Sequence, residues 1–148
     1  MTNKDTNERV QLLSKMIGTD PKHWPFPITR NLEVHLLEVN IGSIKFKVTV
    51  KEDWLNPLNI LHGGIMVTLM DDAMGIAVYT LNQENRFASI NLNTDFFKSV
   101  KEGEQIFIHS KIEKAGRQVV HATAYIENEK GQLIAKSTSN LVVFPKKS

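Results

Sequence analysis

The stretch NPLNILHGGIMVTLMDDAMGIAVYTL, residues 56–81, decides the fold of this chain. From residue 65 onward, its apolar side chains recur at helical spacing over more than about four turns. These side chains are Ile65, Met66, Leu69, Met70, Ala73, Met74, Ala77, Val78 and Leu81. So wide an apolar stripe predicts a long, largely buried helix over residues 65–81. A single helix of this kind needs a sheet to cover it.

On both sides of this helix, apolar and polar side chains alternate with the period of a β-strand. The predicted strands are residues 33–39 and 43–50 before the helix, and 87–97, 105–112, 118–126 and 133–144 after it. Turn sequences such as Asn40-Ile41-Gly42 separate them. In strand 87–97 the alternation places Ser89 and Asn91 on the polar face, opposite Ile90.

The first part of the chain, residues 1–30, is a lead-in to this pattern. Residues 5–17 predict a short amphipathic helix with Val10, Leu13 and Ile17 on one face. The sequence Trp24-Pro25-Phe26-Pro27 predicts an ordered surface loop, because two prolines in four residues disfavour a helix.

Together these elements predict an α+β fold, in which one antiparallel sheet of about six strands wraps around the long helix. With 148 residues, the chain is expected to be one domain, residues 1–148. An open sheet has an unpaired edge strand, and such an edge favours pairing with a second copy of the chain.

Composition narrows the function. The chain has 18 Lys and Arg against 16 Asp and Glu, a net charge of 18 − 16 = +2, which argues against a nucleic-acid partner. It has no cysteine, so disulfides and thiolate metal sites are excluded, and its histidines show no metal-ligand spacing. There is neither a signal-peptide pattern nor an apolar run long enough for a membrane span, so we expect a cytoplasmic protein without a metal or a membrane partner.

Two aspartates inside the apolar helix are the first candidate functional residues. At 100° per residue, Gly64, Thr68, Asp71 and Gly75 share one narrow stripe opposite the apolar face. A carboxylate between glycines lies where a ligand can approach the backbone closely. Asp72 points a further 100° around the helix. The alternative is that both acids belong to an ordinary solvated helix face.

The triplet His62-Gly63-Gly64 at the helix start is the second candidate. Unpaired N–H groups at a helix N-terminus can bind an oxyanion, although the triplet could equally be a cap and a turn. His62 and Asp71 are nine residues apart, about 13 Å along a helix axis. Either the two groups do not cooperate, or two antiparallel helices at a dimer interface combine them.

At these residues the chain resembles a known family. Asn56 to Gly64, then Asp71 and Gly75, are similar to the signature of the hotdog-fold acyl-CoA thioesterases, in their phenylacetate-degradation (PaaI-type) branch. Ser89, eighteen residues after Asp71, also fits. The resemblance extends over about residues 32–144. Asn59 departs from it, because the family usually has Gly there, but Asn also tolerates left-handed backbone.

The resemblance implies a role for each residue. Asp71 would be the general base or the nucleophile, and the Gly63 N–H and Asn56 would bind the thioester carbonyl oxygen. His62 would orient the loop and polarise the carbonyl, and Ser89 would help hold the water. Family sites combine the Asn and HGG groups of one subunit with the Asp and Ser of another, which implies a homodimer or a homotetramer of two dimers.

Further residues are candidates for substrate contacts. Gly64 and Thr68 share the stripe of Asp71, and Asn91 shares the polar face of Ser89. Arg117 could meet the phosphates of coenzyme A, as could several lysines, although solvated strand faces explain these cations equally well. The lysines are Lys98, Lys101, Lys111 and Lys114.

The expected reaction is hydrolysis of an acyl-CoA thioester to a free acid and CoA. A thioester is already activated, so a base, a water and an oxyanion site suffice, and no cofactor is expected beyond the CoA of the substrate. Whether Asp71 attacks directly or activates water is open. Two alternatives are a non-catalytic acyl-CoA-binding module, which would lack the carboxylate, and a hydratase or dehydratase of the same fold, which would need a histidine and an acid acting together.

Overall fold

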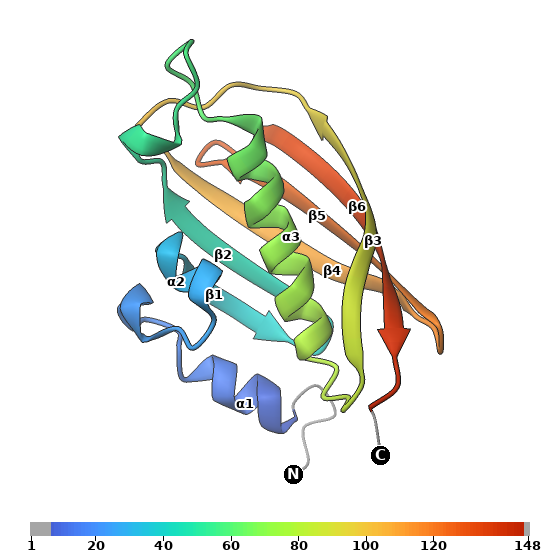
Figure 1. Cartoon of the computed structure of the whole chain (residues 1–148). Helices are drawn as coiled ribbons and strands as arrows, with labels where there is room; N and C mark the ends of the chain where they lie inside the picture. The colour runs from blue at the N-terminus through green and yellow to red at the C-terminus, as the bar shows by residue number, and fades with distance from the viewer. Residues whose placement is uncertain (1–6, 147–148) are drawn as a thin grey trace.

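The computed structural model describes residues 7–146, built around one sheet and one long helix (Figure 1). The sheet has six strands in the order β1-β2-β4-β5-β6-β3, and every neighbouring pair is antiparallel. The strands are β1 (His35–Asn40), β2 (Ser43–Thr49), β3 (Arg86–Phe96), β4 (Gln105–Ala115), β5 (Val119–Asn128) and β6 (Leu133–Phe144). The helices are α1 (Glu8–Ser14), α2 (Pro27–Asn31) and α3 (Gly63–Tyr79), with short 3-10 turns η1 (Pro21–His23) and η2 (Glu52–Trp54).

Helix α3 lies across the concave face of the sheet (Figure 1). Its inward side chains, among them Leu69, Met70 and Met74, are fully buried, as are Phe46 and Ile108 of the facing strands. The core therefore lies between α3 and the sheet, and the predicted α+β hotdog architecture is confirmed. Within the described residues, no helix is both long enough and apolar enough to cross a membrane.

Strand β3 forms an exposed edge of the sheet and departs from the predicted alternation. Its pairing with β6 shifts between Ser89 and Asn91: Ser89 faces Leu141, whereas Asn91 faces the adjacent Asn140. Ile90 is the extra residue of this bulge and is 60% exposed, so the regular alternation of the strand is wrong there. Bulges redirect side chains, and this one separates the directions of Ser89 and Asn91.

The first helix is shorter than predicted. It covers Glu8–Ser14, with the Asn7 side chain accepting the Val10 N–H at its start. Val10 and Leu13 are buried as expected, but Ile17 lies beyond the helix and is 43% exposed. The beginning of the predicted range, residues 5–6, lies outside the described residues.

The predicted ordered loop at residues 24–27 is confirmed for residues 24–26, but it is wrong at Pro27, which is helical, and at Trp24, which is not on the surface. Trp24 is buried, and its indole N–H donates to the Val34 carbonyl at 2.8 Å. Helix α2 begins directly at Pro27, because a proline in the first turn has no N–H to lose and already has a helical φ. This lead-in packs beside α3 and so contributes to the surface described next (Figure 1).

Candidate active site

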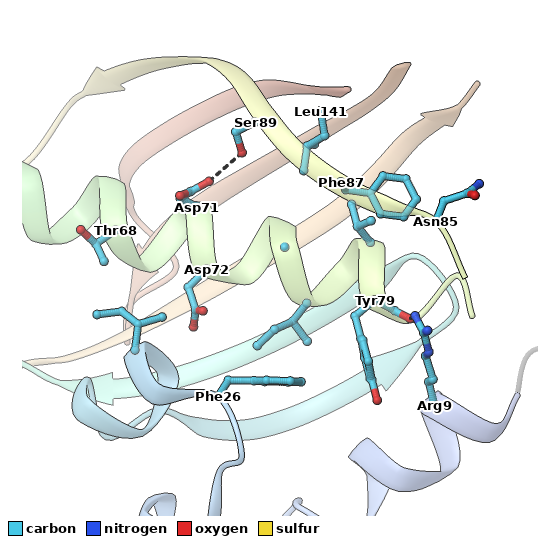
Figure 2. Close-up of a pocket in the computed structure, with 14 residues that line it drawn as sticks. Arg9, Phe26, Thr68, Asp71, Asp72, Tyr79, Asn85, Phe87, Ser89 and Leu141 are labelled. Atoms are coloured by element: carbon cyan, nitrogen blue, oxygen red, sulfur yellow. Dashed lines mark hydrogen bonds between the residues drawn. The ribbon is translucent and has the colours of Figure 1, made fainter. Parts of the chain in front are cut away.

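A cavity of about 630 Å³ runs along the outer side of α3, between the lead-in and strand β3 (Figure 2). We call it the α3 groove. Thr68, Asp71, Asp72, Gly75 and Ser89 are among the residues that line it. A Cβ added at Gly75 would meet nothing within 4 Å, so the groove is open above this glycine. The structure thus brings Thr68, Asp71 and Ser89 of the predicted site together.

Asp71 and Ser89 form the polar centre of this groove. The Ser89 hydroxyl donates to Asp71 Oδ1 at 3.1 Å (Figure 2). Asp71 is half-buried and Ser89 exposed, so a ligand in the groove can reach both. A carboxylate held in this way, with a hydroxyl beside it, can position and deprotonate a water molecule.

Asp72 has a different environment although it is adjacent in sequence. Its side chain leaves α3 on another side, toward the lead-in and Phe26 (Figure 2). The buried Thr29 hydroxyl of α2 contacts both carboxylate oxygens, at 3.0 and 2.8 Å. Burial raises the pKa of Asp72 to about 6, with a smaller contribution from the charge of Asp71, whereas the Thr29 hydrogen bond opposes the rise.

A second cavity, of about 350 Å³, lies at the start of α3 and is lined by Asn56 and Gly63. We call it the helix-start cavity. A Cβ at Gly63 would come within 3.2 Å of the Phe96 ring, which explains the glycine by close packing. Phe96 and Lys98 also line this cavity, and no pattern in the sequence marks Phe96 as a site residue.

Asn56 is held by its own loop. Its Oδ1 accepts the N–H of Leu58 at 2.9 Å and that of Ile60 at 3.4 Å, and Asn59 closes the loop in left-handed backbone with φ of 60°. Within residues 7–146, neither the Asn56 amide N–H₂ nor the Gly63 N–H donates a hydrogen bond. The helix-start cavity therefore presents two available donors, as an oxyanion site requires.

His62 and Gly64 build the helix start itself. The His62 Nδ1 accepts the Gly64 N–H at 2.8 Å, and Thr68 donates to the Gly64 carbonyl at 2.8 Å. A Cβ at Gly64 would lie 2.9 Å from the His62 ring, so only glycine fits beside this cap. His62 is thus an N-cap, and its role in orienting the loop and polarising the carbonyl stays a prediction.

One chain does not unite the two cavities, which have no lining residue in common. Helix α3 is continuous, so Gly63 and Asp71 are about 12 Å apart along its axis. Four of the predicted site residues line neither cavity: His62, Gly64, Asn91 and Arg117. Asn91 turns to β6, where its Oδ1 accepts the Asn140 N–H at 2.8 Å, and Arg117 is exposed in the turn between β4 and β5.

The lead-in side of the groove was not predicted from the sequence. Arg9 lines it, lies 4.4 Å over the Tyr79 ring and donates to the Tyr79 carbonyl at 3.2 Å. Phe26 packs edge-on against the same ring, with centroids 5.5 Å apart. Only the chain's tertiary path brings these residues to α3, so no local pattern could have found them. The described part of the chain holds no group of three or more acidic, His or Cys side chains suited to a metal ion.

Known proteins are similar to this chain in sequence and fold. Human acyl-coenzyme A thioesterase 13 is 26% identical over 105 residues, which cover 70% of this chain and 75% of that protein. The crystal structure of thioesterase superfamily member 2 from Mus musculus matches with a TM-score of 0.78 and 27% identity, covering 95% of this chain and all of that one (100%). The Escherichia coli PaaI protein, at 18% identity, matches with a TM-score of 0.77 over 83% of this chain and 88% of its own.

The antiparallel sheet around a buried helix defines a protein of the hotdog class. The sequence profile of the thioesterase superfamily matches residues 58–135, and the chain belongs to that superfamily. It is a thioester hydrolase.

The environment of Asp72 predicts a pH-dependent stability. Its folded pKa is above the unfolded value of 3.8, so its contribution favours the folded state at low pH and is lost as pH rises from about 4 through about 6. Asp72→Asn should therefore increase the free energy of unfolding more at pH 8 than at pH 4, by up to roughly 3 kcal/mol. Urea denaturation of both proteins at the two pH values measures this difference. An equal effect of Asp72→Asn at pH 4 and at pH 8 would contradict this prediction. Asp53→Asn is the control, because Asp53 is exposed.

Proposed function

We propose that the protein hydrolyses acyl-CoA thioesters to a free acid and CoA. The observation that carries this proposal is the Asp71–Ser89 pair, which lies in a groove open enough for an acyl group. The carboxylate activates a water molecule or attacks the carbonyl carbon itself, and Ser89 helps to hold the water. No cofactor is needed, because CoA is part of the substrate. The name of the human relative, an acyl-coenzyme A thioesterase, supports this substrate class.

The carbonyl oxygen is bound by the Asn56 amide and the Gly63 N–H. Negative charge grows on this oxygen during attack, and two preorganised donors stabilise it most at that stage. Both donors line the helix-start cavity, and Oδ1 of Asn56 is already occupied by its loop, which leaves the N–H₂ group for the substrate.

The complete site forms across a dimer, with the helix-start cavity of one subunit facing the α3 groove of its partner. The separation of about 12 Å along one rigid helix supports this arrangement, because a single carbonyl group cannot span it. Exposed apolar side chains near the helix-start cavity and on the β3 edge also support a second copy: Leu58 is 77% exposed, Phe97 58% and Ile90 60%. The assembly is a dimer or a pair of dimers.

A hydratase requires a histidine beside the acid. Within one chain His62 lies about 13 Å from Asp71 along the axis of α3. In either subunit its Nδ1 accepts the Gly64 N–H, so this nitrogen caps the helix. A binding module would not need the Asp71 carboxylate. The arrangement therefore favours the hydrolase.

The adjacent aspartates provide the direct test. Asp71→Asn should lower kcat by at least about 10²-fold, because Asn still accepts the Ser89 hydrogen bond but cannot act as a base or nucleophile. Asp72→Asn should keep most of the activity toward a short acyl-CoA. Thiol release from a panel of acyl-CoA substrates measures both. An active Asp71→Asn protein would exclude the proposed chemistry.

A substitution at Asn56 can test carbonyl binding separately from the structure of the loop. Asn56→Asp keeps an oxygen that can accept the Leu58 N–H but loses the N–H₂ donor, so kcat should fall by about 10²–10³-fold while the melting temperature changes little. Asn59→Gly is the control in the same loop, because glycine accepts its positive φ. If Asn56→Asp retains the parent kcat, Asn56 is only a turn residue.

Subunit mixing tests the shared site. In a heterodimer of Asp71→Asn and Asn56→Asp subunits, one of the two sites carries both original residues, so part of the activity should return. Two affinity tags and sequential purification isolate the heterodimer. A purified heterodimer as inactive as both parents would show that Asn56 and Asp71 do not act across the interface.

A further inference from the structure

We propose that the lead-in determines acyl-chain selectivity: Phe26 and Ile28 form one wall of the α3 groove, and Arg9 closes its far end. The substrates this arrangement fits are acyl chains that are longer than acetyl and end within about 12 Å of the reacting carbon. This inference rests on the proposed function, since it assumes that the acyl group lies in the groove beside Asp71.

The groove is built to receive a hydrocarbon chain. It runs along α3 from Asp71 to Tyr79, eight residues or about 12 Å (Figure 2). Phe87 and Leu141 line it on the β3 side, and Phe26 lines it on the lead-in side. Apolar walls leading away from a polar reaction centre stabilise an acyl chain in proportion to the apolar surface that they cover.

The far end of the groove is polar. Figure 2 shows Arg9, Tyr79 and Asn85 together at the end of α3 remote from Thr68. A hydrocarbon chain that continued past Tyr79 would have to remove water from the Arg9 guanidinium and the Asn85 amide, without supplying a hydrogen bond in return. The groove therefore favours chains that stop before this point.

The lead-in wall is held at two places. Trp24 donates to the Val34 carbonyl, and Arg30 donates to the Trp24 carbonyl at 2.9 Å. Between these anchors, the fully buried Thr29 hydroxyl contacts both oxygens of Asp72. Thr29 and Asp72 are thus positioning residues, since they hold α2, and with it Ile28, against the groove.

This wall lies outside the part of the chain that defines the superfamily. Arg9, Phe26 and Ile28 all precede residues 58–135, whereas Asp71 and Ser89 lie within them. The reaction centre therefore lies inside the range that the superfamily profile matches, and the lead-in wall lies outside it. Changes in the lead-in can alter the acyl selectivity without touching the reacting groups.

Ile28 offers a matched test of the wall. It is 46% exposed, and Ile17 in the same lead-in is 43% exposed but does not line the groove. In Ile28→Ala the ratio of kcat/KM for octanoyl-CoA to that for acetyl-CoA should fall about tenfold, mainly through KM, because apolar contacts to the longer chain are lost. Ile17→Ala should keep the parent ratio. Since neither side chain is buried, both proteins should fold.

A substitution at Arg9 tests the end of the groove, and it should increase the preference for a longer acyl chain rather than decrease it. In Arg9→Ala the ratio of kcat/KM for palmitoyl-CoA to that for octanoyl-CoA should rise about tenfold, because the guanidinium no longer needs to be desolvated. Melting temperatures of the variants check that the lead-in stays folded. An unchanged or lower palmitoyl ratio in a folded Arg9→Ala protein would exclude this residue as the end of the site.

The Thr29–Asp72 contact is tested by rescue. Thr29→Val keeps the shape but removes the hydroxyl, and should shift the octanoyl-to-acetyl ratio in the same direction as Ile28→Ala. Thr29→Ser restores the hydroxyl and should restore the ratio. Loss of stability alone would lower kcat/KM for octanoyl-CoA and for acetyl-CoA by the same factor, and the ratio would not change.

The outcomes distinguish the proposed function from the proposed role of the lead-in. If the parent protein releases thiol from no acyl-CoA, the proposed function is wrong. If it hydrolyses acyl-CoA but the Ile28, Arg9 and Thr29 variants all keep the parent ratios, the function stands and the lead-in is excluded as the selectivity wall.

Discussion

Burial of α3 against the sheet is the interaction on which the rest of the molecule depends. Side chains such as Leu69, Met74 and Ala77 are fully buried, and this burial fixes the rotation of the helix about its own axis. Once that rotation is set, the stripe of Thr68, Asp71 and Gly75 must face outward into the groove. The hydrophobic core thereby aims the carboxylate, and no polar contact is needed to select its direction.

The same rigid helix also separates the two halves of the chemistry. Its N-terminus presents backbone N–H groups that suit an oxyanion, and its middle presents a carboxylate. A helix cannot bring its own start and middle together, since each residue adds 1.5 Å along the axis. In the proposed mechanism α3 therefore carries two half-sites, and a second chain completes each of them.

Asp71 and Asp72 show how position within a fold gives two identical carboxylates different properties. Both line the same groove, yet one contacts an exposed serine hydroxyl of β3 and the other a buried threonine hydroxyl of α2. Burial raises the pKa of Asp72 to about 6, so its charged form is less favourable than that of an exposed aspartate. The buried carboxylate of Asp72 holds α2 in place through Thr29, whereas the carboxylate of Asp71 is accessible to a ligand.

The sequence alone determined the elements that depend on local periodicity. The long helix, the six strands and their order along the chain could be predicted because apolar spacing distinguishes helices from strands, and Asp71, Asn56 and the HGG triplet could be located by their spacing. Tertiary structure decided the rest. The bulge at Ile90 depends on pairing between β3 and β6, and α2 is held beside α3 because Thr29 contacts Asp72, which is 43 residues away in sequence. Likewise Arg9 and Phe26 reach the groove only through packing against Tyr79, a contact across more than fifty residues that no local pattern encodes.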